Sequence, residues 1–171
     1  MRYFSQKGSV LPAGIVMLFL VAAACGTPWR ASSKNGSADA VTVEVRWKND
    51  ADIDLELWKP LPDGGETKVA DCADLPGAGP DRVTGGKTGE TYRFLPPYDS
   101  GVFLVGVSFW APGPSKETKA DVELLVRRRG RLVKRLRKRL DDDKADLWFP
   151  VQVDLPSGKI RVVDRLTYQG L

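Results

Sequence analysis

The sequence lacks histidine altogether and contains only two cysteines, Cys25 and Cys72. Without histidine, the chain has neither the commonest general base nor the commonest transition-metal ligand, and Ser/His and Cys/His dyads are excluded. The apolar run over residues 15–24 has only about half of the roughly twenty residues that a membrane-spanning helix needs. Most enzyme classes and a permanent transmembrane anchor at this segment are therefore excluded.

The N-terminal segment has the order of an export signal. Arg2 and Lys7 precede the apolar run, which ends in three alanines directly before Cys25. Residues 20–25 resemble the lipobox of bacterial prolipoproteins, in which the cysteine is acylated and becomes the mature N-terminus. The resemblance implies a signal peptide over residues 1–24 and a lipid anchor at Cys25 in the cell envelope. An ordinary secretory signal cleaved after the alanines is the alternative.

The residue after the cysteine helps to predict the membrane in which the protein is anchored. Enteric lipoproteins retained at the inner membrane carry Asp at this position, whereas this chain has Gly26. By that resemblance we expect the periplasmic side of the outer membrane or the cell surface. Residues 25–40 are rich in Ser, Gly and Ala and are predicted to form a flexible tether.

The remaining 147 of the 171 residues have an almost balanced charge. Residues 1–24 contain two of the 26 basic residues and none of the 22 acidic ones, which leaves 24 against 22. This balance does not favour nucleic acid as a partner, and the length suits one domain over residues 41–171. If Cys25 is acylated, Cys72 has no disulfide partner, and we expect it to be a small buried apolar residue.

Alternation of apolar and polar residues predicts β-strands throughout this domain. Period-two patterns cover residues 41–47, 53–57 and 149–155, and a turn at residues 156–158 predicts a C-terminal hairpin. Residues 102–110 are apolar at consecutive positions, as in a central strand that is covered on both faces. Short strands separated by Gly and Pro, without a convincing amphipathic helix, predict an antiparallel β-sandwich of immunoglobulin-like or jelly-roll-like type.

The strongest local charge feature is residues 127–139, of which nine of thirteen are Lys or Arg. A hairpin with a three-residue loop over residues 128–130 is predicted, because it places Glu123 opposite Arg135 and Asp121 opposite Arg137. An amphipathic basic helix at a membrane surface and a solvated edge hairpin that prevents aggregation are the alternatives. The hairpin leaves four arginines at its tip as candidate contacts for anionic lipid, polysaccharide or an envelope protein: Arg127, Arg128, Arg129 and Arg131. Since no aromatic residue interleaves with these charges, nucleic acid is not expected to bind them.

A second candidate site is acidic. Asp50, Asp52 and Asp54 resemble the start of a calcium loop, but Leu55 stands where an EF-hand needs Gly and Leu61 where it needs Glu. With Asp81 or Asp74 from the Gly-rich loop as a further ligand, calcium is the one cofactor that the sequence suggests. Simple solvent exposure of these carboxylates along a strand is the alternative.

Several segments together resemble the YfaP-like group, a bacterial domain family of unknown function. They are Trp47, residues 52–57 with Pro60, residues 81–86 with Gly89 and Glu90, and residues 101–103. The resemblance implies an exported β-sandwich and brings no catalytic residues with it.

We therefore expect a non-catalytic envelope module whose β-sandwich binds a protein, a glycan or a lipid headgroup. A calcium-stabilised binding module is one alternative. A glycoside hydrolase is another, because cleavage by two carboxylates needs no histidine. That chemistry requires two carboxyl groups that face each other across a pocket, about 5 to 9.5 Å apart.

Overall fold

The computed structural model describes residues 40–80 and 89–169. Within these ranges the chain forms nine β-strands and one short 3-10 helix, η1 (Cys72–Asp74), and no helix long and apolar enough to cross a membrane. The strands are β1 (Val41–Arg46), β2 (Asp52–Pro60), β3 (Glu66–Asp71), β4 (Glu90–Arg93), β5 (Gly101–Ala111), β6 (Lys119–Arg128), β7 (Arg131–Asp141), β8 (Leu147–Leu155) and β9 (Lys159–Thr167).

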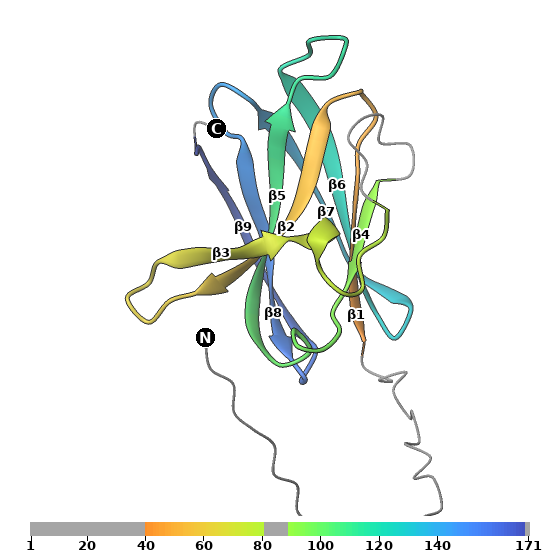
Figure 1. Cartoon of the computed structure of the whole chain (residues 1–171), viewed down its shortest axis with the longest axis vertical. Coiled ribbons are helices and arrows are strands. Elements are labelled where there is room, and N and C mark those ends of the chain that lie inside the picture. The colour runs from red at the N-terminus through yellow and green to blue at the C-terminus, as the bar shows by residue number, and fades with distance from the viewer. Residues whose placement is uncertain (1–39, 81–88, 170–171) are drawn as a thin grey trace, which may run out of the picture. The chain divides into compact units, whose positions relative to one another are not determined.

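Two antiparallel sheets pack against each other (Figure 1). The four-stranded sheet has the order β4-β1-β6-β7, and the five-stranded sheet has the order β3-β2-β5-β8-β9. The predicted all-β antiparallel sandwich is thereby confirmed. Cys25 and Asp81 lie outside the described residues.

The main core lies between the two sheets and follows the predicted alternation. Every second residue of β1, and of β2 from Ile53 to Leu57, is buried there, as in Val43 and Leu55. The central strand β5 places Phe103 and Val107 in this core, while Leu104 is buried on its other face. The prediction of a strand covered on both faces is therefore confirmed, and Cys72 is buried in the core as expected.

A smaller apolar cluster covers the outer face of the five-stranded sheet. The sequence pattern placed Phe149 on the same face as Val151, and this is wrong. A register shift between these residues turns Phe149 outward, where its ring meets that of Trp58 edge to face at 5.3 Å. The shift falls at Pro150, which has no N–H to donate and is accommodated in sheets at bulges.

The two edge strands of the five-stranded sheet are joined across this outer cluster. Arg165 of β9 forms an ion pair of 2.6 Å with Glu66 of β3, although three strands separate them in the sheet. The guanidinium of Arg165 also lies over the Phe149 ring, 4.7 Å from its centre. Arg165 and Glu66 therefore help to cover the apolar cluster on the outer face of this sheet.

A buried carboxylate lies beside the same cluster. The Glu56 side chain is only 1% exposed and accepts hydrogen bonds from Trp58 Nε1 at 2.7 Å and Ser108 Oγ at 3.0 Å. Its charge is paired with Lys68 Nζ at 2.8 Å. Burial by itself would lower the pKa of Lys68, but the hydrogen bonds to Asp71 and Glu56 and the charges of these two carboxylates together outweigh it, so the pKa is raised.

The basic hairpin is formed by β6 and β7, but its predicted loop is wrong. Arg128 pairs with Arg131, so the turn has two residues, Arg129 and Gly130, both with positive φ (52° and 74°). A turn with this backbone matches the twist of the flanking strands. The predicted pairings of Glu123 with Arg135 and of Asp121 with Arg137 are also wrong. A register shift beyond Leu132 places Glu123 opposite Arg137 and Asp121 opposite Arg139, so each acidic residue still lies opposite an arginine.

Candidate functional site: a basic sheet face

The outer face of the four-stranded sheet is rich in charged side chains. Residues that alternate with the core positions of β1, β4, β6 and β7 point away from the core, and the pairing places Arg46, Glu123 and Arg137 in one row. Lys48 follows β1 and lines the same surface. We call this surface the basic face; its charged residues are Arg46, Lys48, Arg93, Lys119, Arg127, Arg135, Arg137 and Arg139 with Glu44, Asp121, Glu123 and Asp141. Eight cations against four carboxylates leave a net formal charge of +4.

Two carboxylates of the basic face are each held by two arginines. Glu44 accepts a hydrogen bond of 2.6 Å from Arg46 Nε and lies 3.8 Å from Arg127. Glu123 pairs with Arg137 at 2.8 Å and with Arg135 at 3.8 Å. These pairs orient the guanidinium groups, while cations remain in excess over carboxylates.

The arginines are available to solvent and also cover apolar surface. The side chain of Arg137 is 75% exposed. Leu125, which lies on the same face between Glu44 and Arg135, is only 1% exposed although it is not part of either apolar cluster. Arginine stems commonly cover apolar surface in this way while their heads stay in water.

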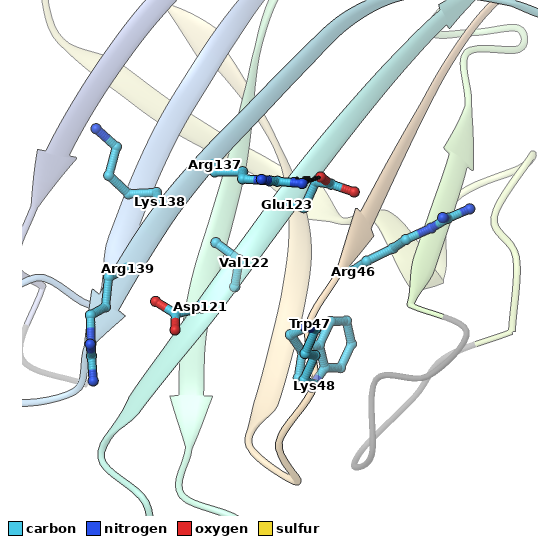
Figure 2. Close-up of a pocket in the computed structure, with 9 residues that line it drawn as sticks. All are labelled: Arg46, Trp47, Lys48, Asp121, Val122, Glu123, Arg137, Lys138 and Arg139. Atoms are coloured by element: carbon cyan, nitrogen blue, oxygen red, sulfur yellow. Dashed lines mark hydrogen bonds and ion pairs between the residues drawn. The ribbon is translucent and has the colours of Figure 1, made fainter.

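A groove of about 930 Å³ crosses the basic face. In Figure 2, the Arg137–Glu123 pair lies between Arg46 on one side of the groove and Arg139 on the other. Nine residues line it: Arg46, Trp47, Lys48, Asp121, Val122, Glu123, Arg137, Lys138 and Arg139. An open groove with several fixed guanidinium groups suits an anionic ligand, because these groups bind carboxylate, sulfate and phosphate through paired hydrogen bonds.

The four arginines predicted at the hairpin tip do not form one site. Arg127 belongs to the basic face, where it approaches Glu44. Arg128 packs against Gly158 in the β8–β9 turn. The contact is so close that a Cβ atom added at Gly158 would lie only 2.6 Å from the Arg128 Nε. Arg129 and Arg131 are exposed at the tip.

The sequence reasoning missed the contribution of β1 and β4 to the charged surface. The period-two pattern of residues 41–47 already indicates that Arg46 points away from the core. The sequence does not show that β1 lies beside β6, so Arg46 could not be placed next to Glu123.

The described acidic candidates do not form a metal-binding cluster. Asp50 accepts hydrogen bonds from the hydroxyl and the backbone N–H of Ser115, and these bonds lower the pKa of its carboxyl group. Asp52 and Asp54 alternate along β2. Residues 40–80 and 89–169 contain no group of three or more His, Cys, Asp or Glu residues that could hold a metal ion. The calcium hypothesis therefore gains no support from the described part of the chain.

The groove contains two carboxylates, but they do not face each other. Asp121 and Glu123 come from one strand and point from the same wall, and Glu123 is paired with Arg137. A glycosidase needs its acid and its second carboxylate on opposite sides of the scissile bond. Cys72 offers no nucleophile either, because burial raises the pKa of its thiol well above the usual value.

Comparison of the chain with models of protein families, with curated proteins and with solved structures finds no match. The resemblance to the YfaP-like group and the lipobox assignment therefore stay predictions.

Proposed function

We propose that this chain is a lipid-anchored protein of the cell envelope whose β-sandwich is a non-catalytic binding module, and that its basic face binds an anionic ligand. The observation that carries the proposal is the excess of arginine on one outer sheet face, where a groove crosses the surface. The lipobox-like sequence before Cys25 supports the envelope location.

The excess of arginine on the basic face is better explained by ligand binding than by a contribution to the stability of the fold. Exposed ion pairs contribute only about 0 to 1 kcal/mol each to the free energy of folding. The excess of like charge on this face therefore has no stabilising effect that would explain it. Arginines near an anionic surface contribute about 1 kcal/mol of binding free energy per charge. Such binding weakens as salt is added, because these groups are exposed and therefore screened.

The location is tested by mass spectrometry of the protein purified from its native membranes. We expect a mature N-terminus at Cys25 that carries fatty acyl groups. An intact Met1, or a free thiol at residue 25, would contradict the anchor and leave only the binding proposal.

Binding is tested by two double variants that remove the same charge from the same hairpin. Arg137→Ser with Arg139→Ser removes two groove arginines, whereas Arg129→Ser with Arg131→Ser removes two tip arginines. On immobilised heparin at low salt, the first pair is expected to lose about 2 kcal/mol, roughly thirtyfold in affinity, at about 1 kcal/mol per charge. The tip pair is expected to lose clearly less, because its residues lie outside the groove.

The two variants also separate specific from general charge effects. Both should keep the thermal stability of the wild type, since they replace exposed residues. Equal losses for the two pairs would mean that retention follows net charge alone. A larger loss for the tip pair would place the anion site at the turn and contradict the role of the basic face.

A further inference from the structure

We propose that the free edge of β7 accepts an extended peptide with carboxylates at alternate positions, which adds to the four-stranded sheet as a further strand. This inference rests on the proposed anion binding by the basic face and names its ligand class.

The strand β7 provides a long edge. It runs for eleven residues, and within the described part of the chain the sheet order ends at β7, with β6 as its only strand neighbour. Edge strands bind extended peptides through main-chain hydrogen bonds, while side chains that alternate along the peptide supply the specificity. The edge of β7 therefore offers backbone partners along a charged surface.

The arginines of β7 have the repeat of a β-strand. Arg135, Arg137 and Arg139 occupy alternate positions on the basic face, so successive guanidinium groups are attached about 7 Å apart. An added strand has the same repeat, and carboxylates at every second residue would lie beside successive arginines. Opposite charges placed across neighbouring strands are favourable. A lipid headgroup or a glycan has no reason to follow this spacing.

The other side of the same edge is partly apolar. Val162 and Leu166 of β9 pair with core residues of β8, lie on the core side of their strand, and are 43% and 39% exposed. Between them Asp164 forms an ion pair of 2.6 Å with Lys138 of β7, which brings the two edges together. Apolar side chains between the carboxylates of an added peptide would cover this surface. The edge thus favours a strand in which acidic and apolar residues alternate.

A second copy of the chain does not fit this edge through its own β7. Pairing β7 with β7 of another molecule would place arginine beside arginine, and like charges across neighbouring strands are destabilising. The same charges that oppose self-association attract an acidic strand.

The test uses synthetic seven-residue peptides with capped ends and the full-length protein. The probe alternates Glu and Val, and a control peptide has the same composition with the four Glu residues in one block. Two further versions of the probe carry N-methyl groups on every second residue, one version for each edge of the peptide. Fluorescence anisotropy at low salt gives the affinities, and amide hydrogen exchange reports on the backbone of β7.

We expect the alternating peptide to bind more tightly than the block peptide and to slow exchange at amides of β7. At least one N-methylated version should lose about tenfold or more in affinity, because several main-chain hydrogen bonds are removed while every charge is kept. The variant with Arg137→Ser and Arg139→Ser should also bind the alternating peptide more weakly.

The outcomes separate this inference from the proposed function. Equal affinity for the alternating, block and both N-methylated peptides would overturn strand addition but leave anion binding in place. Binding to heparin without binding to any peptide would do the same and would favour a glycan. If neither heparin nor the peptides bound, both proposals would fail.

Discussion

Replacing Glu56 by Ala is expected to lower the free energy of unfolding by about 2 to 4 kcal/mol, because two buried or partly buried donors lose their acceptor, at about 1 to 3 kcal/mol each. The carboxylate is 1% exposed and is the hydrogen-bond acceptor for Trp58 Nε1 and Ser108 Oγ. Its loss leaves these two donors without this acceptor and the Lys68 ammonium without one of its two carboxylates. Urea denaturation followed by circular dichroism measures the change.

Two further variants show which part of the network causes the loss. Glu56→Gln keeps an acceptor oxygen but removes the charge, so it should be less destabilising than Glu56→Ala. Glu56→Leu combined with Lys68→Met removes both charges but still leaves Trp58 Nε1 and Ser108 Oγ without this acceptor, so we expect it to recover only part of the lost stability. A loss below about 1 kcal/mol for Glu56→Ala, the level of an exposed ion pair, would show that the carboxylate is solvated.

Glu56 also illustrates what a strand pattern cannot predict. Alternation along residues 52–57 correctly separates the core residues of β2 from the acidic ones and leads to the expectation that the carboxylates project into solvent. For Glu56 that expectation is wrong, because Trp58 and Lys68 cover the outer face where it lies. The ion pair between Glu66 and Arg165 across this face joins residues 99 positions apart, and no local pattern contains that contact.

Most of the sandwich was nevertheless predictable from local chemistry. The strands with clear period-two alternation, the central strand β5 and both hairpins of the second half follow from the sequence. Strand β3 (Glu66–Asp71) was not predicted, since its residues are mostly polar and only partly buried at a sheet edge. Its position depends on pairing with β2 and on contacts from β9, which are tertiary interactions.

The candidate site was predictable only in part for a related reason. The density of Lys and Arg in residues 127–139 identifies the hairpin, but a turn of two residues and a register shift decide which arginines share a face. The basic face further depends on β1 being the neighbour of β6, which brings Arg46 beside Glu123. Strand order is set by how whole sheets bury their apolar faces, so it cannot be read from any one segment.

The second large effect is expected at Trp148, where replacement by Ala should cost about 3 to 5 kcal/mol, as for other buried aromatic residues. Trp148 is fully buried in the main core, and its Nε1 donates a hydrogen bond of 3.0 Å to Asp164. Lys138 lies over the same ring, 5.8 Å from its centre, so the side chain contacts edge strands of both sheets. Its removal therefore leaves a cavity and weakens the contact between β7 and β9.

Trp110 provides the matched control for this prediction. It ends a comparably apolar segment, yet its side chain is 53% exposed, and Trp110→Ala should change stability by about 0.5 kcal/mol, as is usual at the surface. Trp148→Phe should fall between the two, since it keeps most of the buried volume but removes the N–H group. Similar losses for Trp148→Ala and Trp110→Ala would contradict the packing of the sandwich at this edge. Trp148 also holds Asp164, which lies between Val162 and Leu166. Trp148→Ala should therefore weaken binding of the alternating peptide at β7, whereas Trp110→Ala should leave that affinity unchanged.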